Sequence, residues 1–284
     1  MTGQGNDHPL TGGVASVKKQ IICIRWGDRY GVDYVNRLYG MVARNITPPF
    51  SFHCFTDNPD GLHPGIVAHP LPDLGCEMPK TRQGVWGKSR LWRADLGGLS
   101  GPVLFMDLDV VITDNIDPFF SHGDPDDVIL TRNPNTPFER LGQTSLYRFP
   151  VGRLASLHAE FLANPQRVAE TYVFEQRFVT RRAPGGVTFW PRGWVRTFRW
   201  DCVRTFPLNF VLAPKLHAGT RVVIFPGGLN PPDAIAGRWN SRSEALPPMQ
   251  HIRAGLSGRR QGSLLRHLRH YIPPVDWVKE AWRE

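Results

Sequence analysis

Residues 103–112 form an apolar run that two charged side chains interrupt, Asp107 and Asp109. Such a run predicts a buried strand. A carboxylate buried there without a partner costs free energy, so the pair indicates a function. Asp-x-Asp pairs also occur as solvated loop residues, but the apolar flanks favour the buried interpretation. Because residues two apart point to the same side of an extended chain, we expect both carboxylates to bind one Mg²⁺ or Mn²⁺, whose open positions take phosphate oxygens.

Strand-like runs and helical spacings alternate along the first half of the chain. Val35, Leu38, Tyr39 and Val42 predict a helix over residues 32–45. Strands are predicted at 20–26, 51–56, 66–71, 103–112, 128–131, 145–150 and 222–225, and further helices at 86–96, 154–161 and 167–178. The alternation favours an α/β sheet, in which ligands bind beyond the carboxyl ends of the strands. We interpret residues 181–200 and 226–262 as loops over one face.

Composition indicates a globular protein with an anionic partner. The 284 residues are 41% hydrophobic and 21% charged, which suits one α/β domain with extensions. The formal net charge is +9 and the pI is near 9.8. This balance favours nucleic acid, an acidic membrane surface or a phosphorylated substrate as partner, and composition does not choose among them.

The chain carries no targeting or membrane-spanning pattern, so we expect a cytoplasmic protein. No stretch approaches the ~18 consecutive apolar residues of a membrane span. Residues 1–17 are Gly-rich and polar, unlike a signal peptide, and we interpret them as a flexible tail. The four cysteines, Cys23, Cys54, Cys76 and Cys202, include no CxxC pair, so we expect no zinc site and a reducing compartment.

Residues 107–111 are also similar to the motif of haloacid-dehalogenase-type phosphatases, in which the first Asp is the nucleophile and the second an acid or base. Those enzymes usually carry the motif near the start of the domain, and they need a later Lys and a further acidic pair at strand ends. Here Asp126 and Asp127 follow Gly123-Asp124-Pro125 rather than an apolar run. A phosphatase with Asp107 as nucleophile is therefore the weaker alternative.

A wider set of motifs resembles the GT-A glycosyltransferases, in particular family 8 and related bacterial enzymes. The similar segments are residues 24–30, 52–57, 86–91 with 105–120, 143–149, 175–176, 190–199 and 224–232. The family pattern is a lysine-bearing helix, an apolar strand with Asp-x-Asp and then an Asp-Pro-Phe-Phe-like stretch, here residues 117–120. The order of these motifs over residues 19–240 makes the resemblance more specific than any single motif.

The resemblance implies a GT-A-like, Rossmann-like mixed sheet flanked by helices, and transfer of a sugar from a nucleotide-sugar, a UDP-sugar, to a hydroxyl of a glycan or glycolipid acceptor. It implies that Asp107 and Asp109 hold the Mn²⁺ or Mg²⁺ ion, and that Asp109, Glu175 and Gln176 are catalytic. The implied donor-binding residues are Ile24, Arg25, Trp26, Asp57, Lys88, Asp107, Leu108, Gln143 and Ser145. Arg25, Asp57 and Lys88 also have structural alternatives, as a loop arginine, a turn former and an exposed helix lysine.

Two positions depart from the family pattern. The family's metal-binding His falls at Pro226, which cannot coordinate, and the Lys that grips the diphosphate has no counterpart near Asn230. Either His217 or Asn230 stands in, or Asp107, Asp109, phosphate and water alone hold the metal. The loss leaves a third alternative open, a non-catalytic basic module on a decayed transferase fold that binds nucleic acid or a membrane.

Residues 181–205 interleave arginines with aromatic side chains. This composition suits single-stranded nucleic acid, a sugar diphosphate, a lipid-phosphate acceptor or a packed lid. No recognisable RNA- or DNA-binding signature accompanies it, so we do not expect nucleic acid as a partner.

We divide the chain into the tail (1–17), a catalytic domain (18–250) and a basic amphipathic extension (251–284). Five apolar residues of the extension share one face of a helical wheel, and basic residues take the rest, with Arg259 and Arg260 ahead of them. The five are Leu264, Leu265, Leu268, Tyr271 and Ile272. The pattern is typical of a helix on an anionic membrane surface, and equally of a helix that caps the domain. The first alternative predicts peripheral attachment to the inner face of a membrane.

Overall fold

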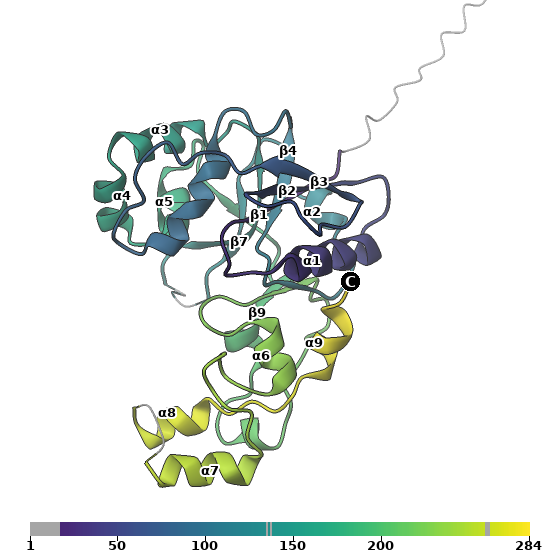
Figure 1. Ribbon diagram of the computed structural model, residues 1–284, viewed down its shortest axis with the longest axis vertical. Helices are drawn as coiled ribbons and strands as arrows, with labels where there is room; N and C mark the ends of the chain where they lie inside the picture. The colour runs from purple at the N-terminus through teal and green to yellow at the C-terminus, as the bar shows by residue number, and fades with distance from the viewer. Residues whose placement is uncertain (1–17, 135, 137, 259–261) are drawn as a thin grey trace, which may run out of the picture.

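The computed structural model describes residues 18–134, 136, 138–258 and 262–284. The expected tail at 1–17, and Arg259 and Arg260, lie outside the described residues. The chain is built on a mixed sheet with helices on both faces, and a smaller sheet and the C-terminal helices lie below it in Figure 1. This is the α/β class that the sequence predicted.

The larger sheet has seven strands in the order β3-β2-β1-β4-β7-β6-β8. Its strands are β1 (Gln20–Arg25), β2 (Ser51–Thr56), β3 (Ile66–Pro70), β4 (Pro102–Met106), β6 (Ile129–Arg132), β7 (Gly142–Pro150) and β8 (Thr188–Phe189). The first four in sequence run parallel, whereas β7 is antiparallel to both β4 and β6. Strands β1 and β4 are buried on both faces, which explains their near-continuous apolar sequences.

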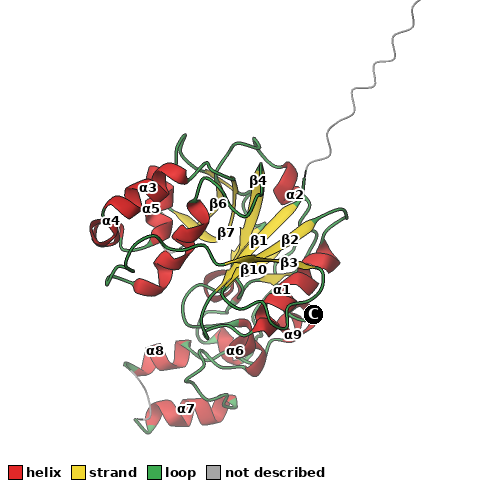
Figure 2. Ribbon diagram, turned by 45° about the horizontal axis from the view of Figure 1, so that its top comes forward, coloured by secondary structure: helices red, strands yellow, loops and turns green. Residues whose placement is uncertain are grey.

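The two faces of the sheet carry separate apolar cores. Side chains alternate along β1, so that Ile21 and Cys23 pack towards α1 (Val32–Asn45), while Ile22 and Ile24 face the other side. That other side is covered by the 3₁₀ helix η1 (Gln83–Trp92) and by α3 (Ala155–Ala163), α4 (Pro165–Tyr172) and α5 (Glu175–Arg182). Figure 2 shows α3, α4 and α5 on one side of the strands and α1 on the other.

A smaller three-stranded sheet continues the α1 side of the core. Its order is β5 (Val111–Ile112), β10 (Val222–Ile224) and β9 (Val195–Thr197). Helices α6 (Pro231–Ala236) and α9 (Asp276–Ala281) pack beside it. Trp282, just after α9, meets Tyr34 of α1 edge to face at 5.1 Å, and Arg44 of α1 donates a hydrogen bond to the carbonyl of Ala281. The end of the chain is therefore fixed to the first helix.

Helices α7 (Pro248–Leu256) and α8 (Leu264–Arg269) lie at the end of the molecule away from the large sheet (Figures 1 and 2). They pack on each other and on η3 (Leu208–Phe210), where the Phe210 ring stacks on Tyr271 at 4.6 Å. Tyr271 and Ile272 are buried, so they do not extend the exposed apolar face that the helical wheel predicted. Helix α8 ends at Arg269 because the chain after it turns into the core.

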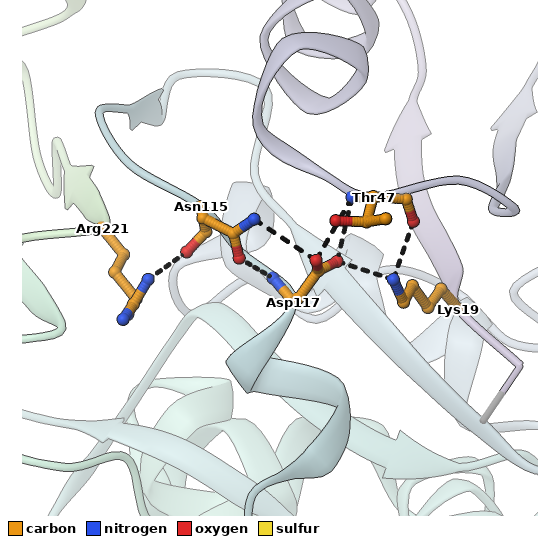
Figure 3. A network of polar contacts seen from close by, with 5 residues as sticks. All are labelled: Lys19, Thr47, Asn115, Asp117 and Arg221. Carbon is orange, nitrogen blue, oxygen red and sulfur yellow. Dashed lines mark hydrogen bonds and ion pairs between the residues drawn. The ribbon is translucent and has the colours of Figure 1, made fainter. Parts of the chain in front are cut away.

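A network of polar contacts around Asp117 fixes α2 (Pro118–Ser121) against the large sheet (Figure 3). The carboxylate accepts hydrogen bonds from Lys19 at 2.8 Å and from the Thr47 backbone at 3.1 Å, and Arg221 donates to the carbonyl of Asn115. Burial raises the pKa of Asp117, but the hydrogen bonds from Lys19 and Thr47 outweigh it and lower the pKa to about 2. The Asp-Pro-Phe-Phe-like stretch thus begins with a structural anchor.

The prediction of one strand over residues 103–112 is wrong. Strand β4 ends at Met106, the chain turns over 107–110, and β5 belongs to the smaller sheet, where Ile112 pairs with Val222. Both short strands are buried, so the apolar pattern did not distinguish them from one long strand. Asp107 and Asp109 therefore do not share a side because of strand geometry, as the two-residue spacing had predicted. The turn nevertheless brings both carboxylates to one cavity.

Other predicted elements also need correction. Residues 167–178 are not one helix, because Val173 adopts a φ of 63°, rare for a β-branched residue, between α4 and α5. Helix 86–96 is the 3₁₀ helix η1, which begins earlier, and residues 226–262 hold α6 and α7 besides loops. Within the described residues, no helix has the length and apolar character needed to cross a membrane.

Candidate active site

A cavity of about 630 Å³ opens at the carboxyl ends of β1 and β4. These strands are parallel neighbours, and the chain continues from them in opposite directions, with β2 beside β1 and β7 beside β4. Open α/β sheets bind ligands at such switch points. The walls come from the loops after β1 and β4, the start of β7, the start of α5, and η2 (Phe198–Cys202). We call this space the donor-side cavity, after the donor-binding residues that the sequence resemblance predicted.

All but one of the site residues selected from the sequence line the donor-side cavity. They are Ile24, Arg25, Trp26, Lys88, Asp107, Leu108, Asp109, Gln143, Ser145, Glu175 and Gln176. The exception is Asp57, which is exposed and accepts a hydrogen bond of 2.9 Å from the backbone of Gly27. In the structure Asp57 shapes the loop after β1 rather than the cavity wall. Asp57 lies outside the wall because the end of β2 is one strand farther from the cavity than the end of β1, and its donor-binding role stays a prediction.

Arg25 combines a cavity position with a structural role. Its Nε donates to the Tyr30 carbonyl at 3.1 Å and its Nη1 donates to the Asn58 carbonyl at 2.7 Å. The guanidinium therefore ties the loop after β1 to the loop after β2. Arg25 is thus a structural loop arginine and also a residue of the cavity wall.

The ring of Trp26 lies against η1 because position 87 is glycine. A Cβ built on Gly87 would sit 2.6 Å from Cζ2 of Trp26, closer than real side-chain contacts. The three residues Trp86, Gly87 and Lys88 thus have three different roles. Trp86 is fully buried in the core, Gly87 lets the indole of Trp26 approach, and Lys88 enters the cavity.

Lys88 neutralises the first carboxylate of the pair. Its Nζ lies 2.7 Å and 2.9 Å from the two carboxylate oxygens of Asp107, and 3.9 Å from Oε1 of Glu175. Burial lowers the pKa of Lys88, but Asp107 and Glu175 outweigh it and raise the pKa. Lys88 is therefore a cation in the cavity with a side chain only 14% exposed, not the exposed helix lysine of the structural alternative.

Asp109 is buried and has a different partner. Its Oδ2 accepts a hydrogen bond of 2.8 Å from the Tyr30 hydroxyl. Burial and the neighbouring charge of Asp107 raise the pKa of Asp109 to about 7, and burial and Asp109 raise the pKa of Tyr30. Two carboxylates so close repel each other, and a bound cation would relieve that repulsion.

Glu175 enters the cavity because α5 begins there. The break at Val173 ends α4, and Glu175 becomes the first residue of α5, where it is 5% exposed. The Thr144 hydroxyl donates to Oε1 of Glu175 at 2.6 Å. Next to it, Oε1 of Gln143 accepts from the backbone of Ser145 at 2.8 Å, which fixes the Gln143 side chain. Glu175 is thus held beside Lys88 by a neighbouring strand.

Sequence reasoning missed Arg29, Tyr30, Arg177, Arg199 and Trp200 as cavity residues. Arg29 and Tyr30 lie in the exit loop of β1. The resemblance had already placed this loop near the nucleotide, so their position in it was the signal that could have identified them. Arg199 and Trp200 lie in the stretch of mixed arginines and aromatics. The remaining arginine, Arg177, lies in α5 two residues after Glu175, and no pattern marked it.

The stretch at 181–205 is not one continuous basic and aromatic surface. Arg181 and Arg182 pair with acidic residues, at 2.7 Å from Glu139 and 2.9 Å from Glu160. The aromatic residues Trp190 and Phe198 are buried in the core. Some residues of the stretch lie in the core, some in solvent and some in the cavity wall. Composition alone could therefore not distinguish which of them meet a ligand.

Neither stand-in proposed for the missing metal ligand lines the donor-side cavity. His217 Nε2 lies 2.9 Å from the Asp201 carbonyl, and Asn230 caps α6 in a capping box with Asp233. Among the residues that the structure describes, no three His, Cys, Asp or Glu side chains cluster in a way that could hold a metal. Asp107 and Asp109 nevertheless suit a hard cation that takes its other ligands from phosphate and water.

Comparison with known proteins places the fold. No protein-family model and no curated protein matches the sequence. A crystal structure of the galactosyltransferase LgtC with donor and acceptor sugar analogs matches at a TM-score of 0.54 and 13% identity, over 86% of this chain and 96% of that one. A structure of an active-site mutant of LgtC matches at 0.51 and 13%, over 88% and 99%. The apo structure of WbbM, a bifunctional glycosyltransferase, matches at 0.53 and 14%, over 80% and 48%.

The chain has the GT-A fold. This confirms the fold that the sequence motifs implied, and it does so on geometry, because 13–14% identity is too low for sequence alone to carry the comparison. Fold similarity does not by itself establish an activity, which depends on the residues of the site.

Proposed function

We propose that this protein is a glycosyltransferase that moves a sugar from a nucleoside-diphosphate sugar, a UDP-sugar, to a hydroxyl acceptor. The observation that supports this most is the grouping of Asp107, Asp109, Lys88 and Glu175 in one cavity at the switch point of a GT-A fold. Carboxylates that can hold a cation, a buried lysine and flanking arginines suit a diphosphate leaving group. The LgtC structure contains donor and acceptor sugar analogs, in agreement with such partners.

The residues of the cavity divide the work of the reaction. Trp26 and Tyr30 offer aromatic surface at the end of β1, where a nucleobase would lie. Arg29 and Arg199 line the same cavity and carry positive charge to a diphosphate in place of the family lysine missing near Asn230. Asp107 and Asp109 would hold Mn²⁺ or Mg²⁺, which supplies charge stabilisation to the leaving diphosphate.

Glu175 and Gln176 line the cavity, with Glu175 beside Lys88, and this position supports a role for them at the donor sugar. When the bond from the anomeric carbon to the diphosphate breaks, positive charge develops on the sugar. A buried carboxylate held by Thr144 and Lys88 is positioned to stabilise that charge without moving. This assigns Glu175 an electrostatic role, with Gln176 as its neutral neighbour.

Isothermal titration with UDP, with and without Mn²⁺, tests the proposal. A transferase of this kind binds UDP in a metal-dependent way, and it hydrolyses a UDP-sugar slowly when no acceptor is present. A phosphatase would bind a phosphate mimic at Asp107 in place of UDP. A non-catalytic module would bind neither ligand, and that result would remove the proposal.

We also propose that η3, α7 and α8 attach the protein to an anionic membrane surface. Large apolar side chains of this region are exposed, among them Val211 at 77%, Leu256 at 65% and Leu265 at 46%. The basic residues Arg266 and Arg269 lie on α8. Apolar and basic side chains together suit binding at a lipid interface.

Deleting residues 259–284 would not test this, because Val278 and Trp282 belong to the core. The double variant Leu256→Ser/Leu265→Ser removes exposed apolar surface only. We expect weaker sedimentation with vesicles of equal parts phosphatidylcholine and phosphatidylglycerol. Val67→Ser, on the exposed part of β3, is the matched control. Equal sedimentation of all three proteins would contradict membrane attachment by these helices.

A further inference from the structure

A second and larger cavity, of about 1200 Å³, lies on the side of the molecule that holds α7 and α8. Its walls are the segment from Gly237 to Leu246, helix α7, the residues at the end of α8, and Arg29 and Tyr34 from the N-terminal part of the chain. None of the catalytic residues proposed above lines it. We call it the basic cavity.

The charges of the basic cavity are unbalanced. Arg238 is paired with the buried Asp233 at 2.7 Å. Arg29, Arg242 and Arg253 form no ion pair with any described residue, and the guanidinium groups of Arg242 and Arg253 make no hydrogen bond within the described part of the chain either. Glu244 supplies the one carboxylate among the described residues that line the cavity. Three unpaired arginines against one glutamate leave two positive charges facing the cavity.

Two histidines of the wall, His251 and His270, add no charge to this balance near neutral pH. Burial lowers the pKa of His251, and burial together with Arg199 lowers the pKa of His270 to about 4. Both rings are therefore neutral at pH 7. His251 packs within the wall instead. Its ring stacks on that of His267 at 4.0 Å, and Nε2 of each ring lies 2.9 Å from the other residue's carbonyl oxygen.

The basic cavity shares a wall with the donor-side cavity. Arg29 lines both, and Gly227 lines one while Gly228 lines the other. Trp239 of the basic cavity stacks on His270 at 4.3 Å, and the guanidinium of Arg199, which lines the donor-side cavity, lies 4.8 Å from the Trp239 ring. A molecule bound in the basic cavity is therefore next to the bound donor.

We propose that the basic cavity binds the phosphate of a phosphorylated acceptor, and so holds that acceptor's sugar hydroxyl towards the donor. A phosphate monoester carries about −1.5 to −2 charge near pH 7, which matches the two unbalanced positive charges. Guanidinium groups bind phosphate through paired hydrogen bonds. The proposal rests on the glycosyltransferase function above. The phosphate comes from either a soluble sugar phosphate or a lipid headgroup, and the experiment separates these sources.

The test compares the wild-type protein with Arg242→Ser/Arg253→Ser and with Arg167→Ser/Arg192→Ser. The second variant removes the same charge from exposed positions outside both cavities. Each protein is titrated with glucose 6-phosphate in the presence of saturating UDP and Mn²⁺, so that the donor-side cavity is filled. Each is also sedimented with vesicles of equal parts phosphatidylcholine and phosphatidic acid, whose headgroup is a phosphate monoester. UDP binding alone shows that the fold and the donor side are intact.

We expect the cavity variant to bind glucose 6-phosphate at least about tenfold more weakly than wild type, since two charge-assisted contacts are lost, while the control variant binds normally. A loss confined to vesicles also supports the proposal and identifies a lipid phosphate. Competition between UDP and glucose 6-phosphate, or equal weakening in both variants, would overturn it. A wild-type protein that fails to bind UDP would instead remove the glycosyltransferase proposal, so the two failures are distinguishable.

Discussion

The two cavities of this protein handle charge in opposite ways. In the donor-side cavity the three carboxylates have partners inside the protein, because Lys88 holds Asp107, Tyr30 holds Asp109 and Thr144 holds Glu175. In the basic cavity Arg242 and Arg253 are exposed, and neither pairs with a described residue. Buried groups need fixed partners because desolvation is costly, whereas exposed arginines stay solvated until a ligand arrives. Changes on the donor side should therefore be large and insensitive to salt, and changes in the basic cavity smaller and salt-dependent.

The largest effect is expected from Asp109→Asn. This change keeps the shape of the side chain but removes the charge that would bind the cation, so we expect UDP-sugar turnover to fall by about a hundredfold or more. The melting temperature should not fall, because a buried carboxylate with a raised pKa is replaced by a neutral group. Steady-state kinetics with thermal unfolding measure both. Asp126→Asn, in an exposed loop, is the control; equal activity of the two variants would contradict the role of Asp109.

The donor-side cavity also shows what a sequence does and does not reveal. Strands β1, β2 and β4 were predictable because each is an apolar run, and parallel strands end at the same edge of a sheet. Lys88, Glu175 and the aspartates were found through a family pattern. The turn at 107–110 was not predictable, because it depends on the pairing of β5 with β10, more than a hundred residues away.

The basic cavity could not be predicted at all. Arg29, Arg242 and Arg253 lie in two loops and one helix, and no periodicity or motif links them. Tyr34, which lines the cavity with Arg29, also packs on Trp282, so distant parts of the chain meet near this cavity. Contacts between distant segments depend on the whole fold, so local patterns carry no information about them.

A second prediction concerns Gly87→Ala, which disturbs the donor side without touching a charge. The added Cβ would collide with Trp26, so the indole must move, and we expect UDP to bind about tenfold more weakly, the effect of roughly one lost contact. Gly84→Ala adds the same methyl group to the same helix and the same cavity wall, with nothing within 4 Å, so it controls for the methyl group without moving Trp26. Titration of both variants measures the difference. Normal UDP affinity in Gly87→Ala would show that Trp26 does not contact the nucleotide.

Arg29→Ser tests the wall between the two cavities. Because Arg29 lines both, its loss should weaken UDP and glucose 6-phosphate together, each by a few-fold to about tenfold, the scale of one charge-assisted contact. Arg242→Ser/Arg253→Ser should weaken glucose 6-phosphate only. Titrating both ligands at low and high salt makes the comparison, and we expect the glucose 6-phosphate effect to shrink in high salt. If Arg29→Ser changed the affinity for neither ligand, Arg29 would have no binding role in either cavity.

The smallest expected effect is in the pH dependence of stability, where the two regions should differ in sign. His270 has a folded pKa of about 4 against an unfolded value of 6.5, so the unfolded chain binds more protons between these values, and His270 makes the protein less stable as pH falls from about 6.5 to 4. Asp109 has a folded pKa of about 7 against an unfolded value of 3.8, so it makes the protein more stable as pH falls through the same window.

Thermal melts from pH 7 to 5 should therefore show a smaller loss of melting temperature in His270→Phe, which keeps the stacking on Trp239, and a larger loss in Asp109→Asn. His53, whose pKa burial also lowers to about 4, contributes the same background in every variant. The two signs differ because a base is buried at one cavity and an acid at the other. If both variants shifted the pH dependence of the melting temperature in the same direction, this contrast between the cavities would be wrong.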